Sequence, residues 1–262
     1  MEIYILCDME GVTGVTSYEQ EAFPQAPNYA HARRGLVGDL RAAIAGAEEA
    51  GVKRFTVYDM HFYGDNVHSH ELGDNVTLIR GKPLDNGMRR GFAGMFLVGL
   101  HAMAWNPRGV LPHTYNHEIV SIDINGRRVG EIGLEAAGAG WHGCPLIFLS
   151  ADAAGVAEAK TLLGDVEGAV TKPLSAEVGA GEVRERIRCG ARRAVERIRD
   201  FRPFAVPGPC RLEILYNNDA AMASKVAQLT EGQLRDEGLV VIEANDFWSA
   251  YMRFRRTQAR NG

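Results

Sequence analysis

Residues 3–11, IYILCDMEG, join a short apolar run directly to two carboxylates. The apolar run is rich in β-branched and aromatic side chains, which predicts a buried β-strand. Open α/β sheets hold their chemically active residues at the C-terminal ends of the strands. Asp8 and Glu10 follow this predicted strand, and two carboxylates in one crevice are costly unless a cation neutralises them. The stretch therefore predicts an α/β fold with a cation site at one edge of its sheet.

Two further apolar runs are followed by a histidine. Residues 54–58 form a second predicted strand, and His61 comes just after it. Residues 92–100 form the strongest apolar run of the chain and end at His101. Because the carboxyl ends of parallel strands meet at one edge of a sheet, both imidazoles are expected near Asp8.

A predicted β-hairpin adds a third carboxylate. Apolar and polar residues alternate over 120–124 and lead into Asn125-Gly126, a pair typical of a type I′ turn. The return strand, 127–129, precedes Glu131, which can reach the same sheet edge. The candidate metal ligands are therefore Asp8, Glu10, His61, His101 and Glu131.

The rest of the chain continues the α/β pattern. A helix over 28–50 connects the first two strands, which suits a right-handed parallel crossover. Further strands are expected at 76–79, 145–150, 167–171, 211–216 and near 239–243, and further helices from 131 to about 140 and at 152–163, 182–200, 219–228 and 246–256. We expect a mostly parallel central sheet flanked by helices, with a β-hairpin and a second smaller α/β lobe. Residues 1–150 would form the metal-site core, and 151–262 a second lobe that completes one catalytic unit.

Composition excludes several classes of protein. With 262 residues, a net charge of −4 and a pI near 6.1, the chain has no electrostatic reason to bind nucleic acid or an anionic membrane. No apolar run approaches the roughly 20 residues of a membrane span, and Glu2 interrupts any signal peptide. The four cysteines form no C-x-x-C pair, so reduced thiols and a cytoplasmic location are expected.

Mixed imidazole and carboxylate ligands are typical of Zn²⁺, with Mn²⁺ or Co²⁺ as possible substitutes. Five ligands are one too many for a single catalytic zinc with an open position, but they suit two metals if one carboxylate bridges them. Asp8, at the strand tip, is the natural bridge. The alternatives remain open at this stage. The acidic pair could belong to a solvated loop or a helix N-cap, the histidines could be structural, and Glu131 could complement a helix dipole.

Other histidines compete for a role in the site. His113 lies in a long irregular segment, 102–116, of a type that is often functional, and it could transfer protons or stabilise an oxyanion. His117 is a weaker candidate for the same task. His68 and His70 could chelate a metal, but their polar loop favours an ordinary surface position.

These motifs resemble the bacterial D-aminopeptidases of the dipeptide-operon type, which are binuclear zinc metallopeptidases. The resemblance covers about residues 1–150 and rests on Asp8-Met9-Glu10-Gly11, Asp59-x-His61 with Asn66, Gly99-x-His101-Ala102, Gly109-Val110-x-x-His113, and the segment from Asn125-Gly126 to Leu134.

The resemblance implies two zinc ions per subunit. Asp8 would bridge them, with Glu10 and His61 on one ion and His101 and Glu131 on the other. His113 would be the catalytic histidine. It also implies small peptide substrates and a ring-shaped homo-oligomer, such as a decamer.

We therefore expect a binuclear metallo-aminopeptidase that removes N-terminal residues from short peptides, of the D-amino-acid type. One alternative is a binuclear amidohydrolase acting on a non-peptide amide. Another is a non-catalytic metal- or nucleotide-binding module. The only dinucleotide-like pattern, Gly138-x-Gly140-x-x-Gly143, follows a predicted helix rather than a strand, which favours a helix end and a turn. The arginine-rich segment 184–199 has an apolar stripe at helical spacing, which favours a solvated or subunit-facing helix.

Overall fold

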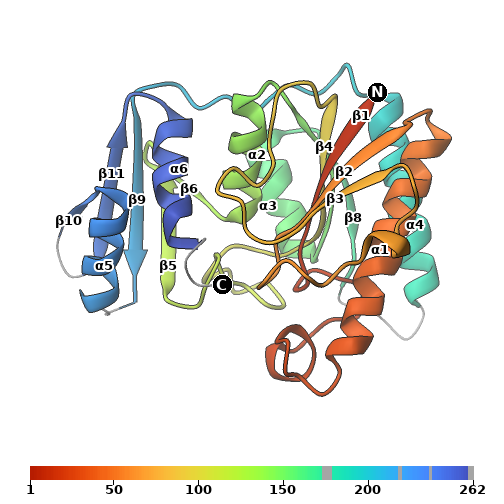
Figure 1. The fold of residues 1–262 in the computed structure, drawn as a ribbon, viewed down its shortest axis with the longest axis horizontal. Coiled ribbons are helices and arrows are strands. Elements are labelled where there is room, and N and C mark those ends of the chain that lie inside the picture. Colours follow the sequence, from red (N-terminus) through yellow and green to blue (C-terminus); the bar gives the residue numbers. More distant parts are fainter. Residues whose placement is uncertain (173–178, 218–219, 236–237, 259–262) are drawn as a thin grey trace.

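A computed structural model describes residues 1–172, 179–217, 220–235 and 238–258. In these residues the chain forms two β-sheets with helices packed on and between them (Figure 1). Residue 219, expected to begin a helix, lies outside the described residues.

The larger sheet is entirely parallel. Its strand order is β3 (Val76–Ile79), β2 (Arg54–Asp59), β1 (Glu2–Cys7), β4 (Gly94–Leu100), β7 (Leu146–Ala151) and β8 (Glu167–Val170). The strand β1 lies in the middle, and its side chains from Ile3 to Cys7 are fully buried. Residues buried on both faces explain why this run shows little polar alternation. The central position also explains why the carboxylates after β1 have a neighbouring strand end on each side.

Helices cover both faces of the parallel sheet. The helices α1 (Tyr29–Glu49) and α4 (Ala180–Glu196) pack together on one face, and α2 (Glu131–Trp141) and α3 (Ala153–Leu163) cover the other. The arginines of α4 form surface ion pairs, among them Arg186 with Glu182 and Arg193 with Glu167. The sequence pattern of this segment, an apolar stripe with charged residues around it, predicts such a helix, packed on one face and solvated on the other.

The smaller sheet is antiparallel. Its order is β10 (Gln233–Arg235), β11 (Leu239–Ala244), β9 (Cys210–Tyr216), β5 (Ile119–Ile124) and β6 (Arg127–Val129). The helices α5 (Ala220–Thr230) and α6 (Phe247–Gln258) pack on it, and α2 lies between α6 and the parallel sheet. Asn125 and Gly126 have φ angles of +50° and +77°, which confirms the type I′ turn of the hairpin.

The predicted fold class is confirmed. Three short elements were not predicted: β10, a π-helical turn at Tyr18–Ala22 and a 3₁₀ turn at Ser69–Glu71. Each sheet contains strands from before and after residue 150. The β5–β6 hairpin belongs to the antiparallel sheet, whereas β8 belongs to the parallel sheet, on which α4 packs. The four cysteines are free. None of the helices in the described residues is long and apolar enough to cross a membrane.

Candidate metal centre

Two glycines let the ends of β1 and β4 approach each other. The Gly11 N–H donates to the Gly99 carbonyl over 2.7 Å. A Cβ atom on Gly11 would lie 1.6 Å from the Leu100 carbonyl oxygen. Gly99 has a φ of +76°, and a Cβ atom there would lie 2.3 Å from the Asp8 carbonyl oxygen. Only glycine fits at both positions, and this close approach brings the residues that follow β1 next to His101.

The five predicted ligands lie together, and Asp8 is shared between two groups of them. Asp8 Oδ1 lies 3.0 Å from His61 Nδ1, whereas Asp8 Oδ2 lies 3.3 Å from His101 Nε2. Glu10 Oε2 completes the first group at 3.1 Å from His61 Nδ1, and Glu131 Oε1 completes the second at 3.3 Å from His101 Nε2. In each group one atom per residue lies within 4.8 Å of the others. All five side chains are buried, at most 4% exposed.

Backbone carbonyls orient both imidazoles. His61 Nε2 lies 2.8 Å from the Ala22 carbonyl oxygen, and His101 Nδ1 lies 3.0 Å from that of Ala102. A ring N–H that donates to a carbonyl leaves the opposite nitrogen free to face the carboxylates. This is the usual arrangement of metal-binding histidines, in which the second ring nitrogen is held by the protein.

The turn that carries His61 is held by Asp59, the last residue of β2. The Asp59 carboxylate accepts hydrogen bonds from the backbone N–H groups of Asn66 and Val67, over 2.6 and 3.1 Å, and from the Asn66 amide over 2.9 Å. The same amide donates to the His61 carbonyl over 2.7 Å. Asp59 therefore supports the site and does not belong to either ligand group.

Glu131 and the irregular segment before the hairpin are also fixed. Glu131 is the first residue of α2, and its Oε1 accepts from the Tyr115 backbone N–H over 2.7 Å. Asp152, the N-cap of α3, accepts from the Val110 N–H over 2.8 Å, and Glu158 accepts from the Met103 N–H over 2.9 Å. Two acids, one at the N-cap and one in the middle of α3, thus hold the segment that contains His113.

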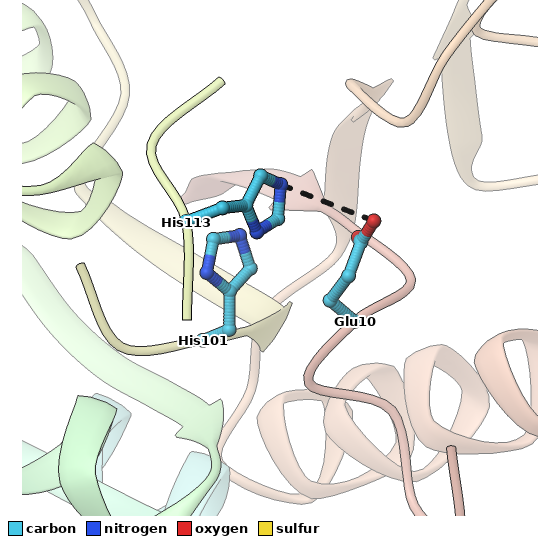
Figure 2. Close-up of side chains that lie close together, drawn as sticks. All are labelled: Glu10, His101 and His113. Carbon is cyan, nitrogen blue, oxygen red and sulfur yellow. Dashed lines mark ion pairs between the residues drawn. The ribbon is translucent and has the colours of Figure 1, made fainter. Parts of the chain in front are cut away.

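His113 faces the centre from this segment, as Figure 2 shows. Its Nε2 lies 4.0 Å from Glu10 Oε1 and 3.9 Å from Glu131 Oε1. Its Nδ1 lies 3.2 Å from the Tyr18 hydroxyl and 3.3 Å from the Leu111 carbonyl oxygen. Burial and the nearby charge of His101 lower the pKa of His113 to about 3. The imidazole is therefore neutral at physiological pH.

The electrostatics of the centre require positive charge. Burial opposes ionisation of Asp8, but the adjacent imidazoles of His101 and His61 hold its pKa well below the usual range. Burial likewise opposes protonation of both histidines, and the charges of Glu10 near His61 and Glu131 near His101 raise their pKa values well above normal. Glu10 Oε2 and His101 Nε2 are buried without a hydrogen-bond partner. Atoms in this state fit ligation of a cation, which would also neutralise three crowded carboxylates.

The other histidines lie outside these ligand groups. His68 and His70 stack on each other at the 3₁₀ turn, away from the centre, as their loop pattern predicted. His117 lines the cavity over the centre and stacks at 5.4 Å on His113, so it faces substrate space rather than the ligand atoms. Gly140 lies in α2, and Gly143 in the turn after it has a φ of +81°, which confirms a helix end in place of a nucleotide loop.

Sequence reasoning missed part of the cavity wall. The cavity has a volume of about 330 Å³, and besides the predicted residues it is lined by Tyr58, Lys82, Tyr115 and Arg255. Lys82 follows the end of β3, so the strand-end argument could have found it. Arg255 lies four residues after Tyr251 on the apolar face of α6, where a charged side chain is unexpected.

The fold and the site define an α/β protein with a buried, carboxylate-rich metal centre at the C-terminal edge of its parallel sheet. The chain belongs to the M55 peptidase family: the family model, described as D-aminopeptidase, matches residues 1–256.

Two relatives illustrate the similarity. A D-aminopeptidase of Bacillus subtilis (strain 168) is 31% identical over 178 residues, which cover 66% of this chain and 64% of that protein. The aligned part thus spans less than two thirds of this relative. A solved structure, the Zn-dependent D-aminopeptidase DppA from Bacillus subtilis, described as a self-compartmentalizing protease, superposes with a TM-score of 0.91 at 24% identity. The superposition covers 99% of this chain and 98% of that one and shows the same fold.

Proposed function

We propose that this protein is a binuclear zinc-dependent aminopeptidase that removes N-terminal residues from short peptides, of the D-amino-acid type. The observation that carries the proposal is the shared carboxylate of Asp8, whose two oxygens face His61 and His101 in two separate ligand groups. The family description and the names of both relatives support peptide substrates of the D series.

In this proposal Asp8 would be shared between two zinc ions, one of which Glu10 and His61 would hold and the other His101 and Glu131. The donor set fits zinc, because imidazole and carboxylate are its common ligands, and Mn²⁺ or Co²⁺ could substitute. When bound, a metal pair polarises a carbonyl and lowers the pKa of water. The protein's own contribution is the buried, pre-oriented donor set.

His113 is the proposed catalytic histidine. It is neutral, and its Nε2 faces the space between Glu10 and Glu131. If Nδ1–H donates to the Leu111 carbonyl, Nε2 is free to accept a proton. If Tyr18 donates to Nδ1 instead, Nε2–H can donate to an oxyanion. Both roles use the same ring orientation.

The wider setting of the enzyme forms part of the same proposal. The DppA structure is described as self-compartmentalizing, which supports a ring-shaped homo-oligomer, such as a decamer, for this chain. Free cysteines support a cytoplasmic location. The segments 1–150 and 151–262 together form one catalytic unit, since α6 contributes Arg255 to the cavity. Native mass spectrometry of the purified protein tests the assembly; a monomer at micromolar concentration contradicts it.

Metal content per chain is the first test. Protein purified without chelators is analysed as wild type, Asp8→Ala, His101→Ala and the surface control His70→Ala. We expect close to two zinc or similar ions in wild type and His70→Ala, and a sharp loss in the other two variants. A folded wild type that holds no metal and cannot be reconstituted with zinc, manganese or cobalt overturns the proposal.

A substrate screen then separates the peptidase from the alternatives. D- and L-dipeptides are assayed beside simple non-peptide amides with the metal-loaded protein. We expect cleavage of dipeptides with a free N-terminus and a preference for the D series. Cleavage restricted to simple amides indicates the amidohydrolase, and nucleotide binding without any hydrolysis indicates a binding module.

A further inference from the structure

The cavity over the metal centre is lined by groups of both signs. The carboxylates of Asp8, Glu10, Glu118 and Glu131 share its wall with two cations, Lys82 and Arg255. The two cations come from different parts of the fold: Lys82 from the segment after β3 of the parallel sheet, and Arg255 from α6 on the antiparallel sheet. A volume of about 330 Å³ is at the lower limit for a ligand site, so a ligand that contacts both the metal ligands and the two cations must be small.

Arg255 is held in place by neutral acceptors. The side chain is 1% exposed, and it donates to the Asn86 amide oxygen, to the Leu84 carbonyl over 3.4 Å and to the Tyr58 hydroxyl over 3.5 Å. No carboxylate of the described residues lies within ion-pair distance of it. Glu135 stabilises the guanidinium by its charge without a direct ion pair, and Asn86 lies between them, its amide nitrogen donating to Glu135 over 2.8 Å.

Glu135 is already fully engaged. Its oxygens accept from the hydroxyl groups of Tyr115, over 2.6 Å, and Tyr251, over 3.0 and 2.9 Å, as well as from Asn86. This network orients the guanidinium without covering it with a direct counterion. A buried cation that is rigidly placed and not directly paired favours binding of an external anion.

Lys82 faces the same space without a partner. Within the part of the chain that the structure describes, its side chain makes no hydrogen bond or ion pair. Burial and the adjacent positive charge of Arg255 lower the pKa of the Lys82 ammonium. Two like charges in the wall of one cavity repel each other, and a carboxylate bound between them removes that cost. Guanidinium and ammonium groups are also the common protein donors to carboxylates.

We propose that Lys82 and Arg255 form a subsite for the C-terminal carboxylate of a dipeptide-sized substrate. The proposal rests on the proposed function, because the candidate metal ligands then receive the N-terminal residue and the scissile bond. The charges that line the cavity set the direction of the peptide: its carboxylate is repelled by Asp8, Glu10 and Glu131 and attracted by Lys82 and Arg255. The subsite limits the substrate to short peptides with a free C-terminus.

Lys82→Gln is the test variant, since Lys82 is only partly buried, whereas replacing the fully buried Arg255 endangers folding. Its matched control is Lys53→Gln, an exposed lysine remote from the cavity, and Lys82→Arg is the conservative rescue. Each is assayed with D-alanyl-D-alanine and with its C-terminal amide, which keeps the amine and the scissile bond but lacks the carboxylate.

We expect wild type to prefer the free acid by about 10- to 100-fold in kcat/KM, mainly through KM, as is typical of a hydrogen bond to a charged group. Lys82→Gln should lose most of this preference, with a much larger loss on the free acid than on the amide, while Lys82→Arg and Lys53→Gln keep it. Equal cleavage of acid and amide by wild type, or an equal loss on both substrates in Lys82→Gln, overturns the subsite.

A binding measurement separates the subsite from the peptidase activity. N-acetyl-D-alanine and N-acetyl-D-alaninamide are titrated into wild type and Lys82→Gln by calorimetry. Binding of only the acid, and only to wild type, supports the subsite even if no peptide is hydrolysed. Hydrolysis of dipeptides with no difference in binding between the two probes supports the peptidase and overturns the subsite.

Discussion

The imidazole rings of His101 and His113 stack nearly parallel, with their centroids 4.0 Å apart and their planes at 14°. The two rings have different surroundings. His101 points its Nε2 at Asp8 and Glu131, whereas His113 is buried beside a positively charged neighbour and stays neutral. Glu10, His101 and His113 also form a group whose polar atoms lie within 4.8 Å of one another, and we propose that His101 is the metal ligand and His113 the acid–base group.

The first prediction concerns this division of roles. His113→Ala should lower kcat by about 10²- to 10⁴-fold, the range of general acid–base catalysis, and leave metal content unchanged. Steady-state kinetics and elemental analysis on the same preparation measure both. His117→Ala, which changes the next ring in the stack, is the control and should keep kcat within about tenfold. Loss of metal from His113→Ala contradicts the assignment, because it would make His113 a ligand.

The second prediction tests the close approach of β1 and β4. A methyl group on Gly11 would lie 1.6 Å from the Leu100 carbonyl oxygen, so Gly11→Ala must displace backbone at the centre. We expect a loss of about 3 kcal/mol or more in the free energy of unfolding, together with reduced metal binding. Gly181→Ala is the matched control, because a Cβ atom there has nothing within 4 Å, and it should be neutral or stabilising by up to about 1 kcal/mol. Similar urea midpoints for the two variants would refute the steric argument.

The third prediction concerns pH. Burial raises the pKa of Glu158 from its usual value to about 7. The folded state therefore binds a proton that the unfolded state releases near pH 4.5, so this contribution to stability is complete below that pH and is lost as the pH rises to about 7. Glu158→Gln should remove this dependence and be more stable than wild type above pH 7, by on the order of 1–3 kcal/mol.

Unfolding in urea at a series of pH values between 4 and 8 measures this effect. Glu196→Gln, an exposed acid on α4, is the control and should follow the wild-type curve. If wild type and Glu158→Gln show parallel curves, the buried carboxyl does not titrate between its two expected pKa values.

The fourth prediction concerns the polar network behind the cavity. Tyr251→Phe removes the hydroxyl that donates to Glu135 and accepts from Asn86 over 2.9 Å. We expect a loss of about 1–3 kcal/mol in the free energy of unfolding, because a buried carboxyl and a buried amide each lose a partner. The control is Tyr216→Phe: Tyr216 is also buried, but its hydroxyl makes no hydrogen bond to another described residue, and the change should stay within about 0.5 kcal/mol. If Tyr251→Phe and Tyr216→Phe change the free energy of unfolding equally, the hydrogen-bond network does not contribute to stability.

Much of the fold could be predicted because its signals are local. The buried run before Asp8, the Asn125-Gly126 turn and the helical spacing over 28–50 each depend on a few adjacent residues. The candidate ligands followed from the same signals, since parallel strands present their carboxyl ends at one edge. The short strand β10 was missed because its three exposed residues carry no apolar alternation.

The sequence by itself determined the order of the strands along the chain, the residues at their ends and hence the chemical composition of the metal centre, because each depends on neighbours in sequence. Only the tertiary structure decided that Asp8 turns its two oxygens to different histidines. It also decided that Lys82 and Arg255, which are far apart in the sequence, line one cavity. The first relationship depends on the close approach of β1 and β4, and the second on how the two sheets pack across α2 and α6. Such packing is set by the total buried surface and by polar groups that must all find partners, and no single stretch of sequence contains that information.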